Sequence, residues 1–239
     1  IEESYEAGAT SVCVITAGFK EVGPEGAKME NEIRDFCKAR KIRLLGPNCL
    51  GLINTENNMN ASFAKQMPKP GHISVISQSG ALCTAILDWS IGRGIGLAKL
   101  VSIGNKADLC EVDILQALGE DEQTKVIACY LESITKGEDF IKVAEQVASV
   151  KPVVVLKVGT TQAGSRAASS HTGSLAGEDI AYGAAFRRAG VIRADTFESL
   201  FDYASALAMQ PLPKGNRVAI ITNAGGPGIM AADAVENLG

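Results

Sequence analysis

One loop of the sequence carries a residue that can act as a nucleophile. His171 lies in residues 159–177, and nearly all of the remaining positions of this loop are Gly, Ala, Ser or Thr. A neutral imidazole near pH 7 can form a covalent adduct, and small neighbouring side chains let a reacting group approach closely. The alternative is a solvated loop histidine without a catalytic role. Arg166 in the same loop could likewise pair with phosphate or simply be solvated.

Two strand ends carry further candidates for chemistry. Glu132 directly follows one apolar run, and Gln78, Ser79 and Gly80 follow another. Ligands of open α/β sheets collect at the carboxyl ends of strands. A carboxylate there can fix the tautomer of an imidazole and stabilise its cation, and the first N–H groups of a helix can bind phosphate. Ordinary surface charge at Glu132 and a simple helix cap at Ser79 are the alternatives.

Three other turns follow predicted strands and are less specific. Pro47, Asn48 and Cys49 lie in the turn Gly-Pro-Asn-Cys-Leu-Gly, where Asn48 can bond either backbone or ligand. Asn105 follows another strand, and its residue type and position are likewise not specific for one function. Residues 223–228 resemble a phosphate loop but lack the Lys-Ser/Thr of a Walker A sequence and the Gly spacing of a dinucleotide fold.

Short apolar runs that alternate with amphipathic ones must position these residues. The expected strands are 11–16, 43–46, 73–77, 97–102, 126–131, 153–158, 191–194 and 218–222. The expected helices are 28–40, 81–90, 111–118, 138–148, 178–189, 196–209 with Thr196 as N-cap, and one ending at 238. Strict alternation of this kind predicts an α/β fold with open parallel sheets made of right-handed βαβ units.

Proline-rich segments suggest how the chain divides. Pro68 and Pro70 lie in a first linker, and Pro211 and Pro213 lie in a second. We therefore expect three parts: residues 1–66, 67–210 and 211–239. The last part holds a single βα unit, which cannot bury its own apolar face. We expect the sequence to be a piece of a longer protein.

Composition narrows the class of protein. Hydrophobic residues make up 46%, charged residues 21%, and the formal net charge is -4. These values predict a globular chain without nucleic-acid or membrane partners, and the absence of a long apolar run favours a cytoplasmic location. Six cysteines without a C-x-x-C pair predict reduced thiols, and with only two histidines in the sequence we expect no metal site.

Four segments together resemble one family. GPNCLG at 46–51, ISQSGA at 76–81, the strand-ending Glu132 and SSHTGSLAG at 169–177 look like the NDP-forming acyl-CoA synthetases. The similarity is greatest to the ADP-forming acetate/acyl-CoA ligases and more distant to the succinyl-CoA synthetase α subunit. The resemblance implies a partial Rossmann-like CoA-binding domain, a flavodoxin-like central domain with a phosphohistidine loop, and the start of a second flavodoxin-like domain.

The resemblance also implies roles for individual residues. His171 would carry the phosphoryl group and Glu132 would orient it. Gln78, Ser79 and Gly80 would bind phosphate. The family residues that bind CoA and the acyl group match Pro47, Asn48, Cys49 and Asn105.

The implied reaction is that of an acid–thiol ligase. Acyl-CoA, ADP and phosphate are interconverted with the carboxylic acid, ATP and CoA through an acyl phosphate. The ATP-grasp domain that binds ADP/ATP and Mg²⁺ in the family has no counterpart in this sequence, so we expect an ATP-grasp β subunit or domain as partner and an oligomeric assembly. The alternative is a catalytically silent CoA- and phosphate-sensing module, as in synthetase-like domains fused to protein acetyltransferases.

Overall fold

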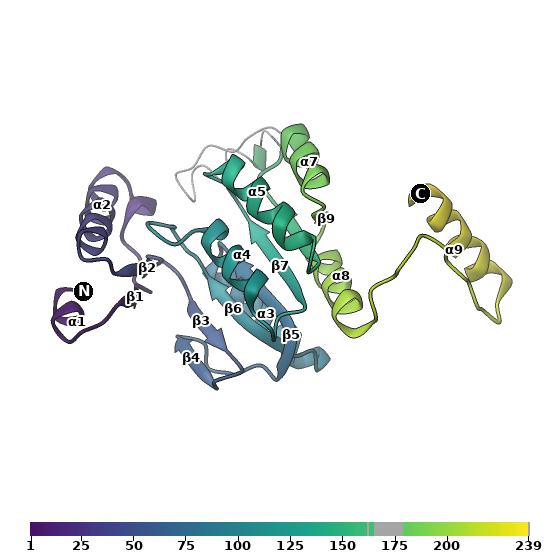
Figure 1. Ribbon diagram of the computed structural model, residues 1–239, viewed down its shortest axis with the longest axis horizontal. Helices are drawn as coiled ribbons and strands as arrows, with labels where there is room; N and C mark the ends of the chain where they lie inside the picture. The colour runs from purple at the N-terminus through teal and green to yellow at the C-terminus, as the bar shows by residue number, and fades with distance from the viewer. Residues whose placement is uncertain (162, 165–178, 239) are drawn as a thin grey trace. The chain divides into compact units, whose positions relative to one another are not determined.

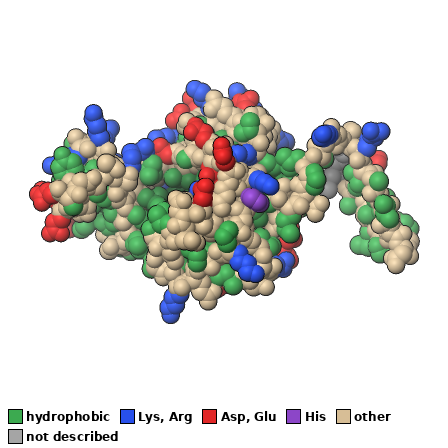
Figure 2. All heavy atoms as spheres, turned by 60° about the horizontal axis from the view of Figure 1, so that its bottom comes forward, with side chains coloured by type: hydrophobic (Ala, Val, Ile, Leu, Met, Phe, Trp, Pro, Cys, Tyr) green, Lys and Arg blue, Asp and Glu red, His purple; other side chains and the backbone are tan. Residues whose placement is uncertain are grey.

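The computed structural model describes residues 1–161, 163–164 and 179–238 (Figure 1). The chain divides into two compact units, Ile1–Met209 and Gln210–Gly239, and each is considered by itself. None of the described helices is both long and apolar enough to cross a bilayer. On the face drawn in Figure 2, basic and acidic side chains of the described residues are interspersed and do not form one basic stripe.

A seven-stranded sheet forms the centre of the first unit, with strand order β4-β3-β6-β5-β7-β8-β9. The strands are β3 (Gly51–Asn54), β4 (Met59–Ser62), β5 (Pro70–Ser77), β6 (Leu97–Ser102), β7 (Val126–Leu131), β8 (Val153–Lys157) and β9 (Ile192–Ala194). Neighbours from β6 to β9 are parallel, whereas β3 is antiparallel to both β4 and β6. The predicted α/β class with a mostly parallel sheet is confirmed.

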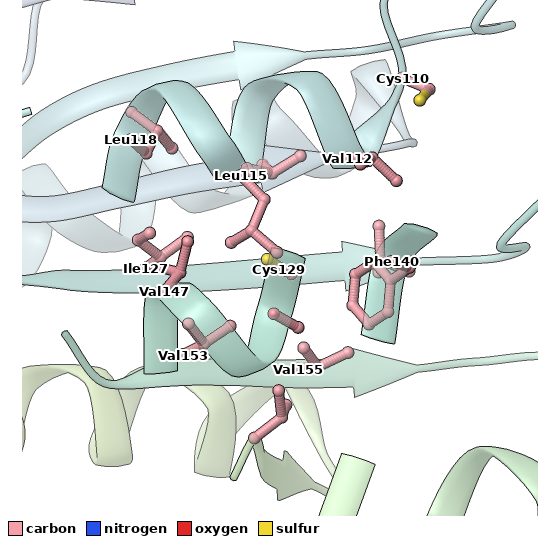
Figure 3. Close-up of a cluster of buried hydrophobic side chains, with 14 of the residues drawn as sticks. Cys110, Val112, Leu115, Leu118, Ile127, Cys129, Phe140, Val147, Val153 and Val155 are labelled. Carbon is pink, nitrogen blue, oxygen red and sulfur yellow. The ribbon is translucent and has the colours of Figure 1, made fainter. Parts of the chain in front are cut away.

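Helices cover both faces of this sheet, which explains why its central strands are mostly apolar. The helices are α3 (Gly80–Arg93), α4 (Glu111–Glu120), α5 (Gly137–Ala148), α7 (Asp179–Arg188) and α8 (Phe197–Met209). Alternate residues of β7 point to opposite sides: Ile127 and Cys129 join a cluster with α4, α5 and α7, and Val126 and Ala128 join a cluster with α3 and α8. Figure 3 shows the first cluster, in which Leu115 and Phe140 pack with Ile127, Cys129, Val153 and Val155 of the strands.

The amino-terminal segment forms a smaller layer of its own. It contains α1 (Glu2–Glu6), β1 (Ser11–Cys13), the 3-10 turn η1 (Lys20–Val22), α2 (Pro24–Ala39) and β2 (Arg43–Leu45). β1 and β2 pair in parallel, and Cys37, Ile42 and Leu44 form a small core beneath α2. The carboxyl end of β2 leads directly into the turn at residues 46–51.

Two expectations about the elements were wrong. The hairpin β3–β4 was not predicted, and it extends the central sheet with residues from the 1–66 part. No strand forms at 218–222, where Ile221 is 98% exposed; a strand needs a hydrogen-bonded neighbour, and none of the described strands pairs with it. The helix that follows, α9 (Gly225–Leu238), does form. The division into three domains stays a prediction.

Two smaller predictions are confirmed. Thr196 caps α8, since its Oγ1 accepts a hydrogen bond of 3.0 Å from the Ser199 N–H. All six cysteines are free thiols, and five of them are buried. Four of the buried cysteines, Cys37, Cys83, Cys110 and Cys129, belong to the apolar clusters, where a reduced thiol packs as a small apolar side chain.

Candidate active site

A pocket of about 360 Å³ brings together five of the predicted site residues. Asn48 and Cys49 enter it from the turn after β2, and Gln78, Ser79 and Gly80 enter it from the connection between β5 and α3. The other lining residues are Ile15, Ala17, Phe63 and Ala81. The pocket therefore lies where the amino-terminal layer meets the carboxyl end of the central sheet.

The N-terminus of α3 forms one wall of this pocket. Ser79 is its N-cap, and its Oγ accepts a hydrogen bond of 3.2 Å from the Leu82 N–H. The first N–H groups of a helix lack acceptors within the helix, and the helix dipole places partial positive charge there. Ser79 thus caps the helix while Gly80 and Ala81, its first residues, line the pocket; phosphate binding there stays a prediction.

Gln78 connects the ends of two neighbouring strands. Its Oε1 accepts hydrogen bonds from the N–H groups of Glu132 (2.7 Å) and Ser133 (2.9 Å), and its Nε2 donates to the Ser133 Oγ (3.0 Å). Ser77 pairs in register with Tyr130, so the residues that follow β5 and β7 lie side by side. The side chain of Gln78 lines the pocket and also fixes the position of Glu132.

Glu132 lies directly after β7, as expected, and its side chain is buried. It does not line the pocket, to which Gln78 connects it. Its backbone is held from both sides: the N–H donates to Gln78, and the carbonyl oxygen accepts a hydrogen bond of 2.8 Å from the Nζ of Lys157. Both partners are buried side chains from neighbouring strands, so the peptide of Glu132 is fixed at the carboxyl edge of the sheet.

Two lysines near Glu132 were not among the residues predicted from the sequence. Lys157 at the end of β8 is only 3% exposed, and Lys106 donates a hydrogen bond of 2.9 Å to the Ser133 carbonyl and pairs with Glu111 at 3.0 Å. A signal existed for Lys157, because it is the one charged residue in the apolar run VVVLKV. Burial lowers the pKa of Lys157 to about 8; the charge of Asp179 opposes this shift, and the charge of Arg193 adds to it.

Asn105 lies next to the pocket without lining it. Its Nδ2 donates to the carboxylates of Glu21 (2.6 Å) and Glu30 (2.8 Å), and its Oδ1 accepts from the Asn48 Nδ2 (3.3 Å). Its N–H also donates to the carbonyl of Pro47. These bonds use the whole amide of Asn105 within the protein, so in this structure it positions Asn48 and the turn.

Cys49 is a protonated thiol in the wall of the pocket. Its Sγ lies 3.8 Å from that of Cys13 and 3.4 Å from the carbonyl oxygen of Val14. The contact with Cys13, followed by burial, raises the pKa of the Cys49 thiol far above its usual range. A thiol in this state is a poor nucleophile and metal ligand, and its small size leaves room in the pocket.

His171 lies outside the described residues, which stop at 164 and resume at Asp179. Both flanks of this segment are described. The chain leaves the sheet at Val158, whose N–H bonds to the Leu131 carbonyl, and resumes at Asp179, which pairs with Arg193 at 2.5 Å. Lys157 links the two flanks, because its Nζ donates to the Val158 carbonyl (2.5 Å) and lies 4.5 Å from the ring centre of Tyr182 in α7. The two flanks of the His171 segment therefore lie beside the backbone of Glu132.

Comparison with known proteins identifies the family. Residues 70–207 match the succinyl-CoA ligase-like flavodoxin domain. The chain belongs to this family. Over its full length it is 50% identical to "Acetate--CoA ligase [ADP-forming] I" of Archaeoglobus fulgidus and 44% identical to "Acetate--CoA ligase [ADP-forming] I subunit alpha" of Pyrococcus furiosus. It covers 35% of the first relative and 52% of the second, so it spans a third to a half of their lengths.

A solved structure shows the same fold as this member of the succinyl-CoA ligase-like family. An acetyl-coenzyme A synthetase of Ca. Korarchaeum cryptofilum, determined in complex with phosphate and ADP, aligns with a TM-score of 0.94 at 40% identity. The alignment covers 99% of this chain and 51% of the other. The sequence resemblance to ADP-forming acyl-CoA ligases is thereby confirmed.

Proposed function

We propose that this chain is the α-type portion of an ADP-forming acyl-CoA ligase, which interconverts acyl-CoA, ADP and phosphate with the free acid, ATP and CoA. The observation that carries the proposal is the pocket in which the N-terminus of α3 meets the turn after β2, with Gln78 connecting it to Glu132. The names of the Archaeoglobus and Pyrococcus relatives support acetate as the acid.

The first step requires an anion site beside a thioester. Phosphate held by the first N–H groups of α3 attacks the thioester carbonyl, the C–S bond breaks, and CoA leaves as a thiolate that takes up a proton. The amides of α3 stabilise the negative charge of phosphate and of the transition state. We assign Asn48 and Cys49 to the thiol end of CoA, because they line the same pocket as the N-terminus of α3. Cys49 stays protonated and does not compete with phosphate for the carbonyl.

The second step transfers phosphorus to the protein. One ring nitrogen of His171 attacks the acyl phosphate, the P–O bond to the acyl group breaks, and the carboxylate leaves. In this proposal, Glu132 accepts a hydrogen bond from the other ring nitrogen and stabilises the positive charge of the phosphohistidine. ADP then attacks the phosphohistidine to give ATP and free histidine.

The nucleotide belongs, in this proposal, to a partner. Among residues 1–161, 163–164 and 179–238, no three His, Cys, Asp or Glu side chains gather as a metal site. These residues do not fit Mg²⁺, and we assign it with ADP to an ATP-grasp domain or subunit. The name of the Pyrococcus relative, a subunit alpha, supports a second subunit, and the Korarchaeum structure supports phosphate and ADP as ligands.

The phosphohistidine is the direct test. Wild-type protein incubated with acetyl phosphate, or with acetyl-CoA, phosphate and the ATP-grasp partner, should gain an acid-labile phosphoryl group that mass spectrometry maps to His171. His171→Ala should gain none. Binding of CoA and phosphate in calorimetry without any phosphoprotein would refute the ligase and favour a ligand-sensing module.

The role of Glu132 gives a second test. Glu132→Gln keeps the side chain's size and removes its charge, so we expect phosphohistidine formation to slow by about 10²-fold or more, the range for losing a group that assists a reacting histidine. Rapid-quench labelling measures the rate, and urea unfolding checks that the variant is folded. A folded Glu132→Gln variant with wild-type labelling rates would contradict the assigned role.

A further inference from the structure

We propose that Lys157 is a positioning residue for the phosphoryl transfer, holding the peptide of Glu132 and supplying a buried positive charge where β7 and β8 end. This inference rests on the proposed function and deepens it. Its basis is the set of contacts that the ammonium of Lys157 makes with residues on both sides of it.

Lys157 binds the first carbonyl groups beyond the ladder between β7 and β8. The last register pair of these strands is Leu131 with Lys157, and the two acceptors belong to the next residues, Glu132 and Val158. A buried carbonyl without a partner costs free energy, so a donor at this place is needed. One ammonium serves both carbonyls and thereby fixes the distance between Glu132 and the start of the segment that carries His171.

The third side of the ammonium faces an aromatic ring. Its Nζ lies 4.5 Å from the ring centre of Tyr182, in the first turn of α7. A cation over an aromatic face is attracted by the ring's quadrupole. Lys157 therefore contacts the last residue before the His171 segment, the helix after it, and Glu132 itself.

The ammonium of Lys157 keeps this buried region from carrying a net negative charge. The charged groups that influence it are Asp179 of α7, Arg193 of β9, Glu132 after β7, and Lys106 from the loop after β6. Lys106 also pairs with the buried carboxylate of Glu111, so three acids face two bases, and the ammonium of Lys157 balances the third acid. A positive charge in a buried region favours a phosphoryl group close by.

A lysine at the other end of the same strand offers a matched control. The Nζ of Lys151, just before β8, also donates to two backbone carbonyls, those of Leu118 (3.1 Å) and Asp121. Burial lowers its pKa as well. Lys151 lies at the amino end of the sheet, away from Glu132, so Lys151→Met removes the same kind of contact without touching the proposed site.

The test compares the pH dependence of phosphohistidine formation in wild type, Lys157→Met, Lys157→Arg and Lys151→Met, each with the ATP-grasp partner present. A lysine with a pKa of about 8 is about 90% charged at pH 7 and about 10% charged at pH 9, so with about a tenth of the rate left in the neutral form the wild-type rate should fall about fivefold over this range. Lys157→Met should be about tenfold slower at pH 7 and should lack this fall. Lys157→Arg should keep its rate to pH 9, and Lys151→Met should follow wild type.

The outcomes separate this inference from the proposed function. If wild type forms no phosphohistidine, the proposed function itself fails. If wild type is phosphorylated and Lys157→Met has the same rate and pH profile, only the role of Lys157 is overturned. Should Lys157→Met not fold, the contrast between wild type and Lys157→Arg above pH 8 still decides, because identical profiles of these two proteins would refute the role of the charge.

Discussion

At the scale of residues, buried polar side chains rather than surface charges organise the candidate site. The peptide groups of Glu132 and Ser133 follow β7, lie beyond the sheet ladder and belong to buried residues. Gln78 supplies acceptors and Lys157 supplies donors for these groups. Asn105 similarly supplies an acceptor for the side chain of Asn48 in the turn after β2. Side chains of this kind determine where the reactive groups lie without reacting themselves.

Gln78 provides a prediction at this scale. Gln78→Leu leaves the N–H groups of Glu132 and Ser133 buried without an acceptor, and we expect a loss of about 2–4 kcal/mol in the free energy of unfolding, measured with urea. Gln78→Glu keeps an acceptor for both groups and should lose much less. Equal losses in the two variants would show that the hydrogen bonds to Gln78 do not hold Glu132.

At the scale of elements, the N-terminus of α3 and the turn after β2 define the pocket. Each is a short local structure whose shape follows from its residue types: a serine that caps a helix, and glycines that allow close approach of two backbones. Their function arises because β2 and β5 deliver them to the same place. A substitution in an element at the pocket can therefore be compared with the same kind of substitution in a similar element away from it. Both should lower stability, but only the first should weaken ligand binding.

Two helix caps allow such a comparison. Ser79→Ala in α3 and Thr196→Ala in α8 each remove the side chain that accepts from the first turn, and each should cost about 1 kcal/mol in unfolding free energy. Only Ser79→Ala should also weaken phosphate binding in calorimetry, because only α3 opens on the pocket. Equal phosphate affinity in both variants would place the anion site elsewhere.

Two glycines with positive φ allow another comparison. A Cβ at Gly104 would lie 2.2 Å from the carbonyl oxygen of Pro47, whereas a Cβ at Gly94 would meet open space. Gly94→Ala should cost about 1–2 kcal/mol for its left-handed backbone, and Gly104→Ala should cost clearly more and weaken ligand binding, because the turn with Asn48 must shift. Thermal unfolding and calorimetry measure both effects, and similar values for the two variants would disprove the close approach.

At the scale of the whole molecule, the parallel sheet brings the residues of the candidate site together. Strands β5, β7 and β8 are neighbours with the same direction, so the residues after them share one edge (Figure 1). Gln78, Glu132 and Val158 are far apart in sequence and meet only at that edge. In our proposal the stability of the fold and the chemistry of the site are coupled there, because the buried Lys157 binds the backbone of both Glu132 and Val158.

The pH dependence of stability follows from this coupling. The pKa of Lys157 is about 8 in the folded chain and 10.5 in its ordinary state, so between these values the unfolded chain binds more protons than the folded one. The free energy of unfolding of wild type should therefore rise relative to Lys157→Met from pH 8 to about 10, and the difference should be constant below pH 8. Urea unfolding at several pH values measures this. A difference that falls above pH 8 would mean that Lys157 is stabilised as the charged form.

The sequence by itself determined most of the elements and the order in which they follow one another. Periodicity located β6 (Leu97–Ser102) and β7 (Val126–Leu131) to the residue, and turn chemistry located the start of α8. These features depend on residues close together along the chain. The resemblance of four motifs added the residues of the candidate site, and five of them share one pocket.

Only the tertiary structure decided the contacts between distant segments. The hairpin β3–β4 has weak strand signals and exists because β3 pairs with β6, and residues 218–222 have strong signals and form no strand among the described residues because no partner strand pairs with them. The same holds for Gln78, Asn105 and Lys157, whose partners come from other strands and loops. Hydrogen bonds and burial across the sheet are non-local, so a one-dimensional pattern does not contain them.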